Sequence, residues 1–251
     1  MARIRIEYGP EPEQFGHLYL PQEPTSDPVP VVMMIHGGFW SGDYHLNVAT
    51  RFSLDLARCG VAVWNIEYRR LGAGGAWPEM SADVTAAWEA IDGPVAASTD
   101  QRLDVSRARL VGNSAGGQLA VWLAGQALSH APERVVAQAG ALDLATAGER
   151  GRRIGYIEKL FGATYDENPD LYRSASPHHR VPIHVPVVCV HGTEDEHVPA
   201  TVSTRYRDAA VAAGDEVALH LIEGEDHFAF VDPASRCWAV SREVVLEGLV
   251  G

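Results

Sequence analysis

The segment Gly112-Asn113-Ser114-Ala115-Gly116 decides the fold that we expect of this chain. An apolar run at residues 108–111 precedes it, and a helix-like stretch at residues 117–128 follows it. The pattern G-x-S-x-G between a strand and a helix is typical of a nucleophile elbow, in which the serine occupies a strained turn and the glycines let the backbone fold tightly around it. An ordinary strand-turn-helix junction is the alternative. Three further segments, in the chain order that an elbow requires, favour the elbow.

The first of these segments, His36-Gly37-Gly38-Phe39-Trp40, follows an apolar strand at residues 30–35. In enzymes with a nucleophile elbow, the loop after this early strand supplies backbone N–H groups to the oxyanion, and the residue after the nucleophile supplies another. We therefore expect an oxyanion hole formed by the N–H groups of Gly38, Phe39 and Ala115. A glycine-rich turn that only ends a strand is the alternative. A nucleotide site is disfavoured, because G-x-G-x-x-G and G-x-x-x-x-G-K-[ST] are both absent from the sequence.

The other two segments each place a polar residue after a predicted strand. Asp195 follows the strand at residues 187–191, and His227 follows the strand at residues 218–222. The order Ser114, Asp195, His227 is the serine, acid, histidine order of an elbow-containing fold. A serine hydroxyl is a poor nucleophile until a base removes its proton, so we expect His227 to act as that base and Asp195 to fix the imidazole tautomer.

Other residues compete for these roles. Glu194 and Glu196 flank Asp195, and we favour Asp195 because of its place in H-G-x-x-D-x-x-V-P. We interpret His191 as ordering the turn after its strand, and His197 as a candidate substrate contact at the rim of the site. No metal is predicted, because four further histidines lack a cysteine or carboxylate at metal-ligand spacing: His178, His179, His184 and His220.

Together, these motifs resemble the α/β-hydrolase superfamily, and within it the esterase/lipase branch that includes kynurenine formamidases and small carboxylesterases. Tyr68-Arg69-Arg70, Trp77-Pro78-Glu79 and Asp83-Val84 are similar to a pattern of that branch between the oxyanion loop and the nucleophile. The resemblance runs from about residue 15 to the C-terminus. It implies a mostly parallel sheet covered by helices on both faces, and acyl-hydrolase activity without a cofactor.

One departure bears on the substrate. Esterases similar to hormone-sensitive lipase usually carry a third glycine where this chain has Phe39, whereas H-G-G-[aromatic]-W resembles the formamidases. We expect the rings of Phe39 and Trp40 to narrow the acyl pocket, which would suit formyl or acetyl groups. The leaving group would then contact the aromatic residues Tyr156 and Phe161. Residues 71–76 match neither subgroup, so the substrate stays open.

Length and periodicity predict one α/β domain over residues 1–251. The chain has 251 residues and 46% apolar composition, enough for one substantial core. An N-terminal hairpin is predicted at residues 4–8 and 16–20. Strands are predicted at 61–66 and 135–139, and helices at 82–91, 201–213 and 234–249. Residues 142–182 form a longer excursion, for which we expect a small cap with a helix at 154–161.

Charge excludes several classes of partner. A formal net charge of −13 argues against binding to nucleic acid or to an anionic membrane. Arg150, Arg152 and Arg153 form one small basic cluster, most simply a solvated surface. No apolar stretch has the length of a membrane-spanning helix, and no signal peptide is recognised. Three scattered cysteines suit a reducing cytoplasm. The sequence leaves the oligomeric state open.

Two classes of function are consistent with these residues. The first is a serine hydrolase that cleaves a small-acyl ester or amide of a small molecule, as a carboxylesterase or arylformamidase does, or that cleaves small peptides. The second is a non-hydrolytic use of the same scaffold by a cyclase, a lyase or a ligand-binding protein, since fold alone does not settle function. A complete serine, acid, histidine set favours the hydrolase, because a binding module has no need of all three.

Overall fold

The computed structural model describes residues 3–23, 26–146 and 154–250. Eight strands of the described chain form one sheet in the order β1-β2-β4-β3-β5-β6-β7-β8. β2 is antiparallel to both of its neighbours, and the pairs from β4 through β8 are parallel. The strands are β1 (Arg3–Glu7), β2 (Phe15–Tyr19), β3 (Val29–Ile35), β4 (Ala62–Ile66), β5 (Leu103–Asn113), β6 (Arg134–Gln138), β7 (Val187–Gly192) and β8 (Val217–Ile222).

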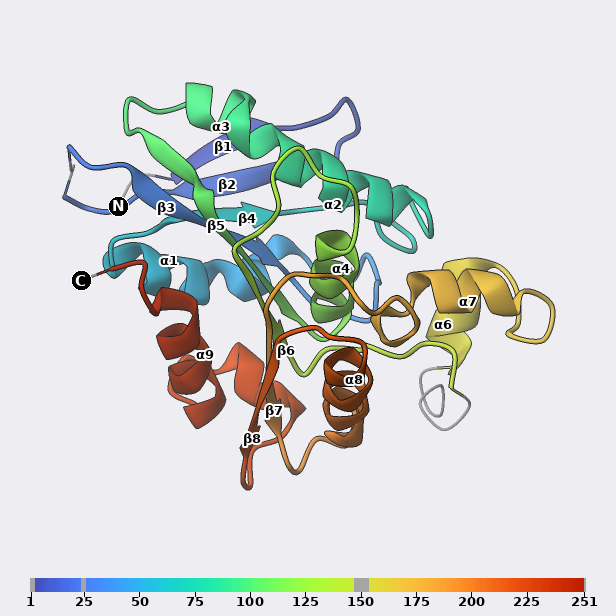
Figure 1. Cartoon of the computed structure of the whole chain (residues 1–251). Coiled ribbons are helices and arrows are strands. Elements are labelled where there is room, and N and C mark those ends of the chain that lie inside the picture. Colours follow the sequence, from blue (N-terminus) through green and yellow to red (C-terminus); the bar gives the residue numbers. More distant parts are fainter. Residues whose placement is uncertain (1–2, 24–25, 147–153, 251) are drawn as a thin grey trace.

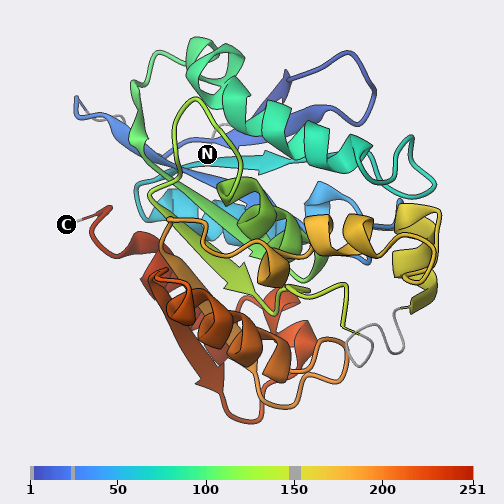
Figure 2. The same ribbon diagram turned by 45° about the vertical axis from the view of Figure 1, so that its right-hand side comes forward.

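Helices cover both faces of the sheet (Figure 1). α1 (Thr50–Arg58) and α9 (Arg236–Leu246) pack on one face, and α2 (Glu79–Glu89), α4 (Ala115–Ala124) and α8 (Thr201–Ala212) cover the other. Figure 2 shows α6 (Ile154–Phe161) and α7 (Pro169–Ala175) beyond α4. The shorter helices are α3 (Pro94–Ala97) and the 3-10 helices η1 (Leu46–Ala49), η2 (Ala90–Asp92), η4 (Pro177–His179) and η5 (His227–Val231).

The composition of the central strands explains the two layers of core. All seven residues of β3 are buried, as expected of a parallel strand with helices on both sides. Val31, Met33 and Ile35 belong to the core beneath α2 and α4, whereas Val32 and Met34 belong to the core beneath α1 and α9. This alternation follows from the two-residue period of a strand. The α/β-hydrolase fold expected from the sequence is therefore confirmed.

The main element that the sequence analysis missed is α1. Its buried residues Phe52 and Leu56 are one turn apart, but no side chain caps its N-terminus at Ala49. The start of this helix lacks a capping residue, although its apolar residues do recur at helical spacing. The omission matters, because this helix contributes to the pocket described below.

The expected cap at residues 142–182 is described only in part. Its helix at residues 154–161 is confirmed as α6, and α7 follows it. The backbone N–H of Trp77 donates to the carbonyl of Leu160 at 3.1 Å, and this hydrogen bond joins α6 to the segment before α2. Residues 147–153, including Arg150, Arg152 and Arg153, lie outside the described residues. Among the described helices, none is long and apolar enough to cross a membrane.

Candidate active site

Ser114 lies on a strained turn between β5 and α4. Its φ of +54° and ψ of −115° are unusual for a residue with a side chain. The turn is held by a hydrogen bond of 2.8 Å from the Ser114 N–H to the Gln138 carbonyl. The flanking glycines are required by close approach, because a Cβ at Gly112 would lie 2.1 Å from the Gly116 carbonyl oxygen, and a Cβ at Gly116 would lie 2.1 Å from that of Ile35. The turn has the geometry of a nucleophile elbow.

The three residues singled out by the sequence meet at this turn. His227 Nε2 is 3.0 Å from Ser114 Oγ, and His227 Nδ1 is 2.6 Å from Asp195 Oδ2. Ser114 follows β5, Asp195 lies in the loop after β7, and His227 begins η5 after β8. Because these strands are parallel, their carboxyl ends meet at one edge of the sheet. All three residues are buried. The contact between Ser114 Oγ and His227 Nε2 provides a path for a proton from the hydroxyl to the imidazole.

Asp195 is the acid of this chain of hydrogen bonds, because both of its oxygens are occupied. Oδ1 accepts from the backbone N–H groups of His197 and Val198, at 2.9 and 2.8 Å. Oδ2 faces His227 and also His191 Nε2, which is 3.2 Å away. Burial alone would raise the pKa of Asp195, but the hydrogen bonds from His191 and His227 outweigh it and hold the pKa well below the usual range. Asp195 is therefore ionised at neutral pH.

The rival carboxylates do not take part in this arrangement. Glu194 and Glu196 are exposed on either side of Asp195. His191 orders the turn, as expected, since its Nδ1 is 2.8 Å from Ser203 Oγ and its Nε2 is 2.8 Å from the Val198 carbonyl. Its additional contact with Asp195 was not anticipated, because sequence spacing alone does not show that the loop folds back on its strand.

The loop after β3 presents backbone N–H groups beside the serine. Gly38 has a φ of +119°, and a Cβ there would lie 2.4 Å from Tyr44 Cβ, so only glycine fits. Phe39 and Trp40 also have positive φ, at 55° each. Within the described residues, the N–H groups of Gly38, Phe39 and Ala115 donate no hydrogen bond. They are therefore free to bind an oxyanion, and the oxyanion hole stays a prediction.

A buried ionic network supports this loop from below. His36 Nε2 is 2.8 Å from Glu67 Oε1, and the Tyr68 hydroxyl donates to the His36 carbonyl at 2.8 Å. Arg70 forms an ion pair with the same Glu67 carboxylate. These contacts account for the Tyr68-Arg69-Arg70 motif as a support for the oxyanion loop.

A second ion pair holds in place the segment after β4, which carries Tyr68 and Arg70. Arg69 binds the buried carboxylate of Asp83 through Nη2 at 2.7 Å and through Nε at 2.9 Å. Gln14 Nε2 donates to the same carboxylate at 2.6 Å. Asp83 lies in α2, so the pair joins this helix to the segment after β4. The two-point geometry is the arrangement in which arginine and carboxylate bind most strongly.

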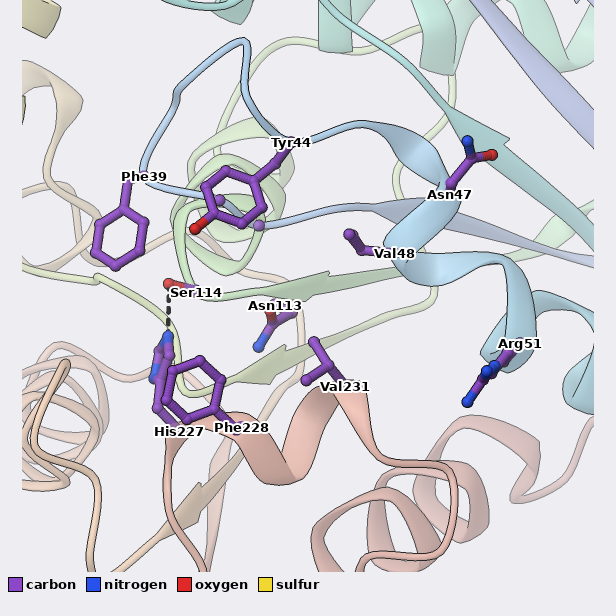
Figure 3. A pocket seen from close by; sticks show the side chains of 12 residues that line it. Phe39, Tyr44, Asn47, Val48, Arg51, Asn113, Ser114, His227, Phe228 and Val231 are labelled. Atoms are coloured by element: carbon purple, nitrogen blue, oxygen red, sulfur yellow. Dashed lines mark hydrogen bonds between the residues drawn. The ribbon is translucent and has the colours of Figure 1, made fainter.

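A pocket of about 400 Å³ opens onto Ser114 (Figure 3). Most of its lining is apolar, and five large apolar side chains are exposed at or near its mouth: Tyr44, Val48, Tyr156, Phe228 and Val231. Exposed apolar side chains gathered at one place mark a binding site. The complete lining consists of Gly37, Gly38, Phe39, Tyr44, Asn47, Val48, Arg51, Asn113, Ser114, His227, Phe228 and Val231.

Several of these lining residues escaped the sequence analysis. Tyr44 lies in the loop after Trp40, and Asn47, Val48 and Arg51 lie in η1 and the start of α1. Their sequence carries no motif. Phe228 had a signal, because it directly follows His227.

Two expected substrate contacts are at the rim. Tyr156 is 42% exposed, and its ring centroid is 5.1 Å from that of Phe39. His197 is exposed, with its ring 5.2 Å from that of His227 and 6.0 Å from that of Phe39. Both are therefore placed where they can contact a ligand bound at Ser114.

The other two expected contacts, Trp40 and Phe161, were wrong. Trp40 is 1% exposed, and its indole N–H donates to Gln118 Oε1 at 3.0 Å. Phe161 is 8% exposed and packs against Trp77 and Tyr172. Burial of a large aromatic ring contributes roughly 1.5–3 kcal/mol, which favours these buried positions over the rim.

The described residues also contain two groups that could hold a metal ion. Asp143, His178 and His179 have ligand atoms within 4.8 Å of one another, so His178 and His179 do have a carboxylate partner, contrary to the inference from spacing. Arg205 already places a guanidinium nitrogen 3.8 Å from Asp143 Oδ2. The second group is Glu13, His45 and Glu67, whose two carboxylates both pair with Arg70. In both places an arginine supplies the positive charge.

Comparison with known proteins identifies a family and several esterases that are similar to this chain. The BD-FAE family model matches residues 17–209, a segment that contains Ser114 and Asp195. Esterase LipC of Mycobacterium tuberculosis is 29% identical over 220 residues, which are 78% of this chain and 52% of that protein. The chain thus spans about half the length of the curated relatives that it matches.

Solved structures with the same fold align over nearly the whole chain. A truncated carbohydrate esterase from gut microbiota has a TM-score of 0.81 and 19% identity, with 99% of this chain and 96% of that chain covered. Esterase 2 of Thermogutta terrifontis, phosphonylated by sarin, has a TM-score of 0.82 and 18% identity, with 100% and 96% covered. At such identities the likeness concerns the fold.

Proposed function

The chain belongs to the BD-FAE family, and on that premise we propose that it is a serine hydrolase that cleaves a small-acyl ester or amide through an acyl-enzyme on Ser114. The observation that carries the proposal is the continuous hydrogen-bond chain from Ser114 Oγ through His227 to the ionised Asp195. The esterase relatives favour an ester over an amide as the first substrate to test.

The proposed reaction has two halves. In the first, Ser114 Oγ attacks the carbonyl carbon while its proton passes to His227 Nε2, and the N–H groups of Gly38, Phe39 and Ala115 bind the oxyanion. His227 then gives the proton to the departing alcohol or amine. In the second half, His227 takes a proton from water, which attacks the acyl carbon, and the proton returns to Ser114 as the acid is released.

The aromatic residues around the pocket support an aryl leaving group. Phe39, Tyr44 and Phe228 line it, and Tyr156 and His197 lie beside Phe39. Flat rings stack well on such side chains. The motif H-G-G-F-W further suggests the arylformamidase type, with formyl or acetyl as the acyl group. A cytoplasmic location and a small-molecule partner, in place of nucleic acid or a membrane, remain predictions of the sequence.

Covalent labelling tests the proposal. A fluorophosphonate should add one adduct to the folded protein, and peptide mapping should place it on Ser114. Ser114→Ala should abolish the adduct, whereas Ser129→Ala, a control on the surface, should retain it. If the folded protein takes no label, the non-hydrolytic class is favoured and the proposal is wrong.

A substrate panel then separates the two finer types. We expect turnover of 4-nitrophenyl acetate and of N-formylkynurenine if the protein is an arylformamidase. Good turnover of the acetate with none of the formamide would assign a small-ester hydrolase.

A further inference from the structure

Arg51 is an unexpected feature of the pocket. Among the described residues that line the pocket, Arg51 is the one with a permanent charge, and no acidic side chain lines it. This is notable in a chain with 33 acidic residues against 20 lysines and arginines. Within the described part of the chain, Arg51 forms no ion pair or side-chain hydrogen bond, although most other arginines of the fold do. Its guanidinium is thus available to a ligand.

The position of Arg51 sets it apart from the reacting atoms. Ser114 and His227 lie at one side of the pocket, whereas Arg51 projects from α1 at the other side, beyond Val48 and Val231 (Figure 3). The side chain of Asn47, from η1, points away from that of Arg51 (Figure 3). Arg51 therefore gives the far end of the pocket a cation, and the apolar side chains of Val48 and Val231 lie between it and Ser114.

We propose that Arg51 binds a carboxylate at the far end of the substrate, so that the preferred ester or amide is that of an anionic molecule with an apolar middle. This inference rests on the proposed function. Arginine binds carboxylates through two parallel hydrogen bonds, which give both strength and orientation. The apolar walls would contact the body of the substrate.

Matched substrates test this assignment on either side of the scissile bond. For the acyl side, the probes are 4-nitrophenyl monoesters of dicarboxylic acids from succinate to suberate, each compared with its neutral ω-carboxamide. For the leaving-group side, the acetate ester of 4-hydroxybenzoate is compared with that of 4-hydroxybenzamide. In at least one pair, kcat/KM for the anion should exceed that for the neutral analogue by about 10-fold at low salt. The preference should weaken at about 0.5 M salt, because ions screen exposed charges.

Three variants locate the effect. Arg51→Gln should bring the ratio close to one by lowering kcat/KM for the anion, and Arg51→Glu should reverse the preference. Arg58→Gln removes the same charge from the other end of α1, outside the pocket, and should keep the preference. An anionic preference that persists in Arg51→Gln would overturn the proposal, since another cation would then be responsible.

The outcomes also separate this inference from the function on which it depends. Equal rates for both members of every pair in the wild-type protein would refute the role of Arg51 and leave the hydrolase intact. Absence of turnover for every neutral analogue, together with no labelling of Ser114, would refute the hydrolase itself.

Discussion

Replacing Asp195 by asparagine tests the proposed mechanism most sharply, because the structure dictates how the amide must sit. Oδ1 accepts two backbone N–H groups, from His197 and Val198. In Asp195→Asn the amide oxygen has to stay there, so the NH₂ group takes the place of Oδ2 and faces His227 Nδ1. Since that nitrogen must then accept a hydrogen bond, the imidazole proton moves to Nε2 and points at Ser114 Oγ. The histidine can no longer take the serine proton.

The expected loss follows from this wrong tautomer. Chemistry that depends on His227 as the base should slow by about 10³–10⁴-fold in kcat, which corresponds to roughly 4–5.5 kcal/mol in the activation barrier. The amide also meets His191 Nε2, a second donor, so the free energy of unfolding should fall by about 1–3 kcal/mol. The measurements are kcat on 4-nitrophenyl acetate and urea unfolding of the same preparation.

Matched controls are provided by the neighbouring acids. Glu194→Gln and Glu196→Gln remove a charge from the same loop, but both side chains are exposed, so kcat should change by less than about 3-fold. The reasoning would be refuted if either control lost as much activity as Asp195→Asn, or if Asp195→Asn kept more than about a tenth of the wild-type kcat while remaining folded.

Four other expectations can be checked on the same preparation. Gly38→Ala should lower kcat by about 10²–10³-fold, because the new Cβ clashes with Tyr44 and displaces the oxyanion loop. The control Gly72→Ala is also at positive φ but has open space around it, so it should leave kcat unchanged. Equal losses of kcat in the two variants would contradict this reasoning. The octanoate ester should show kcat/KM about 5- to 150-fold below the acetate, and Phe39→Ala should reduce that gap; an octanoate turned over as well as the acetate argues against a narrow acyl pocket. EDTA should not inhibit, and loss of activity that zinc restores would point to a required metal. The pKa of Asp195 is lower in the folded protein than in the unfolded chain, so its ionised form stabilises the fold above the unfolded pKa and this stabilisation is lost on acidification. The difference in unfolding free energy between wild type and Asp195→Asn should therefore be largest above about pH 5 and shrink towards pH 2. A difference that does not change with pH would contradict this expectation.

The sequence by itself determined which strand each of the three candidate catalytic residues follows. Buried strands appear as uninterrupted apolar runs, as in β3. Short polar motifs follow such runs, and they contain the serine, acid and histidine that nucleophilic catalysis requires. Ser114, Asp195 and His227 could therefore be assigned from local sequence, and their meeting follows from the parallel sheet. The N-terminal hairpin and α6 were likewise predicted within a residue or two.

Tertiary structure alone decided which side chains face the substrate. Trp40 and Tyr44 are both aromatic residues of one loop, yet the first is buried against Gln118 and the second lines the pocket. Arg51 and Arg58 belong to one helix, but only Arg51 reaches the pocket. Local sequence cannot distinguish such pairs, because burial depends on the packing of segments far apart in the chain. That packing, more than any motif, sets the shape and charge of the site.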